Sequence, residues 1–429
     1  MTKRAWWLVG LNLVLPGSAQ LIAGNRRLGR LDVVTTVVLW VVVVVVLIVA
    51  AANRETLLSL FTNAVTLMAV QIALAVYAIL WVVLTLDTLR LTKLVRIQSR
   101  ARPAVAAVAL VALIAVAGTA GYGSASAGSA RSAIAHIFVG SKYAAPVNGR
   151  YNILLLGGDA GPDRLGLRPD STSIASVDAV TGATTIIGIP RNTEQVRFVK
   201  GSPLWGPFPN GYNCGDQCLI DYLYTYGQAH PELYPKAVAE GSQPGIEAMR
   251  DATEGMLGLT VQYYALIDMQ GFADLVDALG GVTVDVPNNL PYGPVTAKTP
   301  YGVFKAGVQH FNGYDALWYS RSRFNGRDYD RMARQRQVEI AIAQQFQPGI
   351  ILTKFQAIAG AGVQVVKSDI PSSLLAHLVT LAEKGRKLPV TQLALVPPDY
   401  IPAHPDYAKI LAAVNEATRQ STPSPGPTR

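Results

Sequence analysis

Three long apolar runs in the first third of the chain constrain its fold more than any other feature. Residues 32–52, 64–86 and 104–121 contain only one charged side chain, Asp32, and the first run includes six consecutive valines. Each run approaches or reaches the roughly 20 residues that a helix needs to cross the apolar core of a bilayer. We therefore predict a helical transmembrane region over residues 1–121.

A fourth apolar stretch, residues 6–24, is interrupted by Asn12, Pro16 and Gly17. It either crosses the membrane or is re-entrant, so the region has three or four spans, and we favour four.

Basic loops set the orientation, because loops rich in Lys and Arg stay in the cytoplasm. Residues 87–102 carry five basic side chains and one acid, and residues 25–30 carry three basic side chains. Residues 53–63 carry one Arg and one Glu, which suits the outside. We predict a multi-pass protein of the cell membrane whose chain after Gly121 is extracytoplasmic.

The net charge of +9 does not indicate nucleic acid as a partner. Much of the basic excess lies in the cytoplasmic loops, where attraction to anionic membrane lipid explains it. We find no zinc-ligand spacing, no helix-turn-helix pattern and no basic stripe interleaved with aromatics.

Cys214 and Cys218 are the two cysteines. In an oxidising compartment they suit a local disulfide, which we favour over a metal site because the region offers few other ligands.

The remaining chain predicts one globular domain. Residues 122–149 are rich in small side chains and are expected to be a linker; residues 150–420 form the domain, and residues 421–429 are a disordered tail. Strand-like runs such as 151–156 and 184–189 alternate with helix-like runs such as 245–257. This interleaving predicts an α/β fold, with helices layered on both faces of a central mixed sheet.

Two acids and an arginine stand at predicted strand ends. Asp159 follows a strand and two glycines, Asp170 lies in the next loop, and Arg191 ends the strand 186–190. Strand ends are the usual location of ligand sites in layered α/β folds. Paired carboxylates suit Mg²⁺ or Mn²⁺, and arginine neutralises phosphate charge, so the set favours phosphoryl chemistry. Each residue alone also has a structural interpretation, as a turn cap or an ion-pair partner.

Arginine is densest in residues 318–338. In extended backbone, Arg321 and Arg323 project to the same side. One face of the helix that follows carries Arg331, Gln335, Val338 and Ile342. Because that face includes apolar residues we expect it to turn inward, with Arg334 and Arg336 in solvent. Inward arginine with no acid in register predicts a phosphate or pyrophosphate site; the alternative is a structural ion pair.

The order of these segments carries a resemblance over about residues 150–396. The segments are Asn-Ile-Leu-Leu-Leu-Gly-Gly-Asp159, Arg168-Pro-Asp170-Ser, Gly-Ile-Pro-Arg191, Tyr-Ser-Arg321-Ser-Arg323 and Asp-Arg331-Met-Ala-Arg-Gln335. Together they resemble the LytR–CpsA–Psr family. The resemblance implies an extracytoplasmic phosphotransferase that moves a glycopolymer from a polyprenyl-pyrophosphate carrier to peptidoglycan and leaves polyprenyl phosphate.

The resemblance also implies roles for single residues. Asp159 and Asp170 match the acids associated with Mg²⁺, and with Arg191 they form the expected catalytic set. The implied pyrophosphate-binding residues are Arg168, Arg191, Arg321, Arg323, Arg331 and Gln335. Two positions depart from the family pattern: Asn192 stands where Asp is common, and Gly158 stands where Ser is more usual.

The implied mechanism is attack by a muramic-acid hydroxyl on the sugar-proximal phosphorus, with Asp159 or Asp170 orienting or deprotonating that hydroxyl. Two other functions remain compatible with the same residues. One is hydrolysis of the lipid-linked pyrophosphate, and the other is a non-catalytic membrane sensor or regulator that binds lipid-linked glycan.

Overall fold

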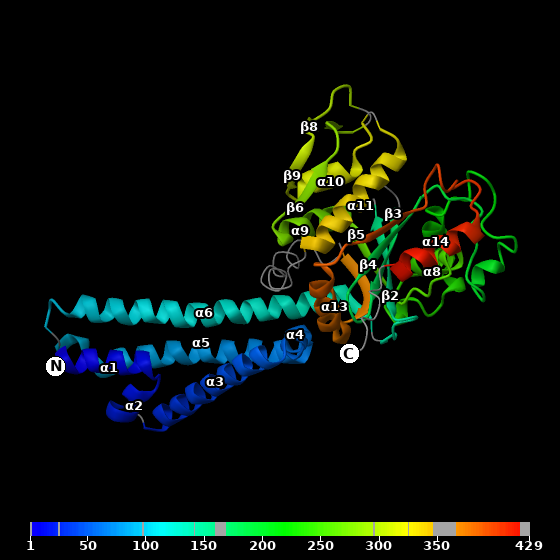
Figure 1. The fold of residues 1–429 in the computed structure, drawn as a ribbon. Coiled ribbons are helices and arrows are strands. Elements are labelled where there is room, and N and C mark those ends of the chain that lie inside the picture. Colours follow the sequence, from blue (N-terminus) through cyan, green and yellow to red (C-terminus); the bar gives the residue numbers. More distant parts are fainter. Residues whose placement is uncertain are drawn as a thin grey trace, which may run out of the picture. The chain divides into compact units, whose positions relative to one another are not determined.

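The chain forms two compact units, Met1–Ser132 and Ala133–Arg429. The computed structural model describes residues 2–24, 26–96, 98–140, 142–158, 169–294, 297–324, 326–345 and 366–420. Figure 1 shows the course of the chain. Asp159, Arg168 and the predicted tail 421–429 lie outside the described residues.

The first unit is helical, as predicted. Its helices are α1 (Thr2–Val14), α2 (Ser18–Ala23), α3 (Arg26–Ala52), α4 (Arg54–Thr62), α5 (Ala64–Thr92), η1 (Leu94–Arg96) and most of α6 (Arg102–Ile137). Among the described residues, three helices are long and apolar enough to cross a membrane: α3, α5 and α6. These are the three runs that the sequence predicts.

The stretch between residues 6 and 24 does not form one continuous helix. It breaks after α1, where Pro16 lacks a backbone donor and Gly17 takes a φ of 88°. With 13 residues, α1 reaches roughly 20 Å, short of the roughly 30 Å of a bilayer core. Both α1 and α2 contact α5, and Gln20 of α2 donates hydrogen bonds to the Leu84 carbonyl (3.1 Å) and the Thr88 hydroxyl (3.0 Å). The structure thus favours three spans over four.

Helix α6 continues beyond the predicted span, into the segment expected to be a linker. Residues 122–137 contain five alanines and no proline, and alanine is the best helix former. The helix ends at Ile137, and the chain passes directly into strand β1 (Phe138–Gly140). Of the predicted linker 122–149, only the part after β1 connects elements as a linker does. The prediction was wrong for residues 122–137, because small residues fit a helix as well as a flexible segment.

A mixed sheet forms the centre of the second unit and confirms the predicted α/β class. Its seven strands among the described residues follow the order β1-β10-β5-β2-β3-β4-β11. The further bounds are β2 (Arg150–Gly158), β3 (Pro169–Asp178), β4 (Thr184–Ile189), β5 (Tyr263–Asp268), β10 (Val366–Pro371) and β11 (Thr391–Ala394). Strand β2 pairs antiparallel with β3 and parallel with β5, which makes the sheet mixed.

Helices cover both faces of this sheet (Figure 1). On one side lie α8 (Pro244–Leu257) and α14 (Tyr407–Gln420); on the other lie α9 (Met269–Leu279) and α11 (Asp328–Gln345), and α13 (Ser372–Gly385) covers β1 and β10. The largest core joins Leu154, Ile174 and Ile187 of the strands to side chains of α8 and α14. All three are fully buried, and each contributes about 1.5–3 kcal/mol by leaving water.

A smaller lobe packs on α11. It contains β6 (Val282–Val286) paired with β9 (Gly307–Phe311), β7 (Leu290–Tyr292) paired with β8 (Gly302–Phe304), and helix α10 (Gly313–Arg321). Phe304, Phe311 and Tyr319 form its core together with Val338 of α11. The segment between β4 and α8 holds η2 (Pro203–Trp205), α7 (Tyr222–Ala229), η3 (Pro231–Leu233) and η4 (Val238–Glu240).

Candidate functional site

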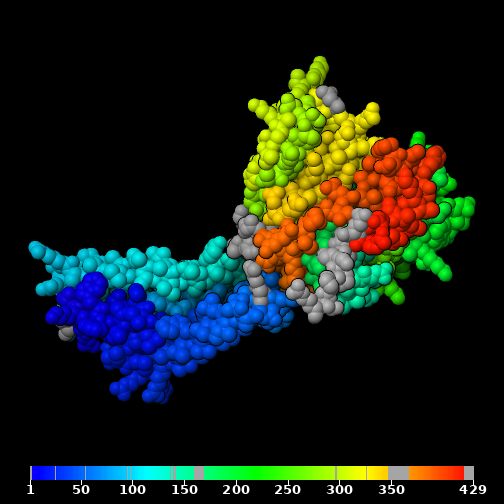
Figure 2. All heavy atoms as spheres, in the orientation of Figure 1, coloured from blue at the N-terminus to red at the C-terminus, as the bar shows by residue number. Residues whose placement is uncertain are grey.

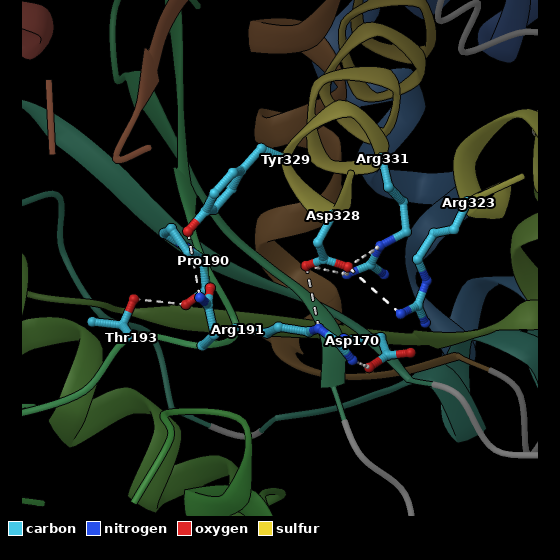
Figure 3. A network of polar contacts seen from close by, with 9 residues as sticks. Asp170, Pro190, Arg191, Thr193, Arg323, Asp328, Tyr329 and Arg331 are labelled. Atoms are coloured by element: carbon cyan, nitrogen blue, oxygen red, sulfur yellow. Dashed lines mark hydrogen bonds and ion pairs between the residues drawn. The ribbon is translucent and has the colours of Figure 1, made fainter. Parts of the chain in front are cut away.

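The candidate site begins where β3 and β4 reach the same edge of the sheet. The strands are antiparallel neighbours with Thr172 opposite Ile189, so the residues just beyond this pair meet in space. Arg191 follows β4, and its Nη1 donates to Oδ1 of Asp170 at 2.9 Å. Its Nε donates to Oδ2 of Asp328 at 3.3 Å. Arg191 therefore bridges two carboxylates from different elements (Figure 3).

Asp328, the first residue of α11, is the centre of the network. Arg331 donates to it through both Nε and Nη2, each at 3.2 Å. Nη1 of Arg323, from the turn before α11, lies 3.7 Å from Oδ1. One carboxylate thus faces the guanidiniums of Arg191, Arg323 and Arg331 (Figure 3).

The charges in this network are unequally compensated. Burial raises the pKa of Asp328, but Arg331, and then Arg191 and Arg323, more than offset it and hold that pKa below its ordinary value. The pKa of Arg323 is lowered, by burial first and then by Arg331 and Arg191. A depressed arginine pKa means that its positive charge is poorly balanced, so an added anion beside Arg323 is favoured.

Four of the predicted site residues are therefore brought together: Asp170, Arg191, Arg323 and Arg331. Arg331 is almost fully buried, as the helix phase predicts. Gln335 is half-buried one turn further along α11.

Arg321 departs from the expected extended run. It is the last residue of α10, and its guanidinium lies 5.9 Å from the centre of the Trp318 ring. The helix continues to this residue because nothing in residues 313–321 interrupts it. Arg321 therefore does not share an extended strand with Arg323.

The prediction that Arg334 and Arg336 face solvent is wrong. Both are buried. Nε of Arg334 donates to the Tyr319 carbonyl at 2.9 Å, and Nη2 donates to the Ser322 carbonyl. Arg336 packs on the sheet, since a Cβ added to Gly188 of β4 would lie 3.2 Å from its Cδ. The expectation that no acid stands in register is also wrong, because Asp328 lies three residues before Arg331.

Asn192 and Asp221 border the network. Nδ2 of Asn192 donates to the hydroxyl of Tyr329 at 3.4 Å. Asp221 is buried and adds a weaker attraction to Arg191. The backbone of Asp221 also donates to the Arg191 carbonyl at 3.4 Å. Three residues earlier, Cys218 is joined to Cys214 by a disulfide, which closes the loop that leads into this contact.

No group of three or more His, Cys, Asp or Glu side chains is arranged to hold a metal ion within the described part of the chain. Asp170 is the one predicted metal ligand that this part contains, and carboxylate oxygen is a ligand that Mg²⁺ accepts. The second predicted ligand, Asp159, is outside it. Metal binding therefore stays a prediction.

Sequence reasoning missed Asp328. Its signal was available, because an acid three residues before an arginine on a helix lies on the same face. Asp221 had no such signal, since it reaches Arg191 only through the fold.

Comparison with known proteins gives the family. Residues 123–401 match the profile of the LytR_cpsA_psr family. The chain is 29% identical over 226 residues to a polyisoprenyl-teichoic acid–peptidoglycan teichoic acid transferase TagU of Enterococcus faecalis, covering 51% of this chain and 61% of that protein. It is 24% identical over 205 residues to the corresponding transferase TagV of Bacillus subtilis, covering 47% and 45%. The chain thus spans less than two thirds of the length of either relative.

Solved structures resemble the chain at low identity. The crystal structure of B. subtilis TagV matches with a TM-score of 0.45 and 21% identity, covering 65% of this chain and 100% of that one. The family protein YwtF (TagT) with bound octaprenyl pyrophosphate lipid matches with a TM-score of 0.42 and 20% identity, covering 65% and 92%. Since the profile match alone extends over more than half of its residues, the chain belongs to the LytR–CpsA–Psr family.

Proposed function

We propose that this protein is a phosphotransferase that moves a glycopolymer from a polyprenyl-pyrophosphate carrier to peptidoglycan. The observation that carries the proposal is the convergence of Arg191, Arg323 and Arg331 beside Asp170. Family membership and the transferase activity in the names of TagU and TagV support it. The lipid-linked glycan and the peptidoglycan acceptor are the partners it requires.

Guanidinium groups suit the pyrophosphate, because their planar donors match phosphate oxygens and remain charged. Arg323 is the first candidate for a contact, since its side chain is more exposed than those of Arg191 and Arg331 and its guanidinium lies farther from Asp328. Arg191 and Arg331 already hold Asp328, and they would share their donors between this acid and the ligand.

The reaction forms one phosphorus–oxygen bond and breaks another. An acceptor hydroxyl oxygen attacks the sugar-proximal phosphorus, the bond to the bridging oxygen breaks, and polyprenyl phosphate leaves. The hydroxyl proton passes to a carboxylate, for which Asp170 and Asp159 are the candidates. Asp159 and Asp170 would also be the residues that hold Mg²⁺ or Mn²⁺, which supplies charge neutralisation when bound.

We place the second unit outside the cytoplasm. Three candidate spans put the two ends of the chain on opposite sides of the membrane, and the basic loops 25–30 and 87–102 then both face the cytoplasm. The short α1–α2 pair leaves the basic N-terminus, Lys3 and Arg4, on the cytoplasmic side. A compartment without nucleotides suits a transfer that draws its energy from the carrier pyrophosphate.

The test is transfer by the full chain reconstituted in vesicles with a lipid-linked oligosaccharide and a peptidoglycan acceptor. Arg331→Ala should raise the activation barrier to transfer by about 2–4 kcal/mol, because it removes a charge-assisted contact. The rate of transfer should then fall roughly 30- to 1,000-fold. Asp170→Asn should stop turnover while the protein still binds the carrier. Arg419→Ala, at an exposed arginine on α14, is the matched control and should leave transfer unchanged.

Two outcomes contradict the proposal. Release of polyprenyl phosphate at the same rate with and without peptidoglycan would identify a hydrolase. Full complementation of a deletion by Asp170→Asn, at parental protein level and without measurable turnover, would identify a sensor of lipid-linked glycan.

A further inference from the structure

Exposed apolar side chains gather on the small lobe of the second unit. Tyr301, Val303 and Tyr314 are 62%, 49% and 53% exposed. Figure 2 shows this lobe, in lime and yellow, standing out from the rest of the unit. Soluble surfaces rarely collect large apolar side chains in one place unless that place contacts a partner.

Two of these side chains lie beside Trp318. The rings of Tyr301 and Tyr314 lie 5.5 and 6.3 Å from the Trp318 ring, centre to centre. Tyr301 immediately precedes β8 and Val303 lies within it, two residues further on, so in extended backbone the two side chains point to the same side. Phe304 points the other way, into the core of the lobe. We call Tyr301, Val303, Tyr314 and Trp318 the aromatic surface.

Basic groups border the aromatic surface. The guanidinium of Arg321 lies over the Trp318 ring, and Lys298 and Lys305, on either side of β8, are both exposed. Tyr and Trp combined with Lys and Arg are the side chains that proteins place at the interface between water and an anionic bilayer.

The aromatic surface also adjoins the arginine site. Only Ser322 separates Arg321 from Arg323, and its hydroxyl donates to the Pro291 carbonyl at 2.8 Å. The backbone carbonyl of Ser322 also accepts a hydrogen bond from Nη2 of Arg334. This double attachment fixes the short segment between the aromatic surface and the arginine that faces Asp328.

We propose that the aromatic surface docks on the lipid bilayer, with its rings at head-group depth and its basic border against anionic lipid. The inference rests on the proposed function, because a lipid-linked substrate resides in the bilayer and the protein must meet it there. Docking brings Arg323, two residues along the chain from Arg321, close to the membrane that holds this substrate. A saccharide is the other possible occupant, but Arg321 already covers the Trp318 ring, and Val303 offers a sugar no hydrogen bond.

The experiment places a fluorophore at Val303→Cys in the full chain, reconstituted in vesicles of equal parts phosphatidylglycerol and phosphatidylcholine. The native cysteines are joined in a disulfide, so the new thiol is the labelling site without reductant. The control is Val180→Cys, an exposed position in the turn between β3 and β4. The label at 303 should lose its quenching by aqueous iodide and gain quenching by a nitroxide carried on lipid, whereas the label at 180 should show neither change.

Charge is tested separately with the double variant Lys298→Gln and Lys305→Gln. Each basic side chain near an anionic surface contributes about 1 kcal/mol, so removing two should shift docking roughly thirtyfold toward the undocked state. Purely phosphatidylcholine vesicles should also shift the unchanged protein toward the undocked state.

The measurement needs no turnover, so its failure is distinct from failure of the transferase proposal. Equal iodide quenching at 303 and 180, with no lipid quenching at either, overturns the docking proposal even where transfer proceeds. Protection of the label at 303 by a soluble glycan fragment in detergent, with no protection by vesicles, overturns it in favour of a saccharide surface.

Discussion

Glu339 of α11 offers a test of how this helix is held against the sheet. The hydroxyl of Ser173 on β3 donates to its Oε1 at 3.2 Å. Its Oε2 is buried without a hydrogen-bond partner within the described part of the chain. Burial raises the pKa of Glu339 from its ordinary 4.5 to about 7, against the opposing effects of the Ser173 hydroxyl and the Arg336 guanidinium. The folded protein therefore keeps this carboxyl protonated where the unfolded chain does not.

The sign of the effect follows from this difference. Glu339 supports the folded state fully below pH 4.5, and that support is lost as the pH rises to about 7. At about 1.36 kcal/mol for each pKa unit, the loss is about 3 kcal/mol. Glu339→Gln stays neutral and keeps the oxygen that accepts from Ser173. It should therefore match the parent near pH 4 and exceed it by about 3 kcal/mol at pH 8.

Thermal unfolding of the full chain in detergent between pH 4 and 8 measures this difference. For a unit of this size, about 3 kcal/mol corresponds to roughly 5–10 °C in Tm. Glu416→Gln, at an acid on the exposed side of α14, is the matched control and should follow the parent at every pH. A constant offset between Glu339→Gln and the parent, with the same pH slope, would refute the reasoning, because the proton would then be bound elsewhere.

Two further predictions concern stability and orientation. Arg334→Ala should lower the stability of the second unit by about 2–4 kcal/mol, because it leaves the buried carbonyls of Tyr319 and Ser322 without a charged donor; a Tm equal to that of Arg419→Ala would contradict this. A reporter active only in the cytoplasm, fused after residue 420, should be silent, and strong activity there would overturn the predicted orientation.

Sequence patterns predict most reliably the elements whose residues all lie in one environment, such as a membrane span or a buried strand. The runs 32–52 and 64–86 lie within α3 and α5, because an unbroken apolar run has few alternatives to a span. Runs 151–156 and 184–189 are β2 and β4, buried strands bounded by turns. Residues 122–137 were ambiguous, since alanine and serine suit both a linker and a helix, and only the continuation from α6 decides between them.

A site residue was predictable from the sequence where its position is fixed by the strand or helix to which it belongs. Arg191 follows a strand, and Arg331 shares a helical face with Val338, so their positions follow from local rules. The contact between Arg191 and Asp328 joins residues 137 positions apart. No period in the sequence encodes such a contact, because it depends on how α11 is placed over the edge of β4.

The error at Arg334 and Arg336 has a physical cause in the position of α11. Amphipathic reasoning assumes one buried face, but α11 contacts α10 and β6 as well as β4. At 100° per residue, the stripe of Arg331, Arg334 and Val338 lies roughly 140° from the stripe of Arg336 and Glu339. The first stripe faces the lobe, and the second faces the sheet.

A helix covered on two sides must satisfy its charges with protein groups. Carbonyl oxygens hold Arg334, while Arg336 and Glu339 lie against β4 and β3. Arginine density alone is therefore a poor indicator of ligand binding in this segment. The arginines that meet at Asp328 are the better candidates, because one carboxylate holds several guanidiniums together at the place where the proposed function requires a pyrophosphate.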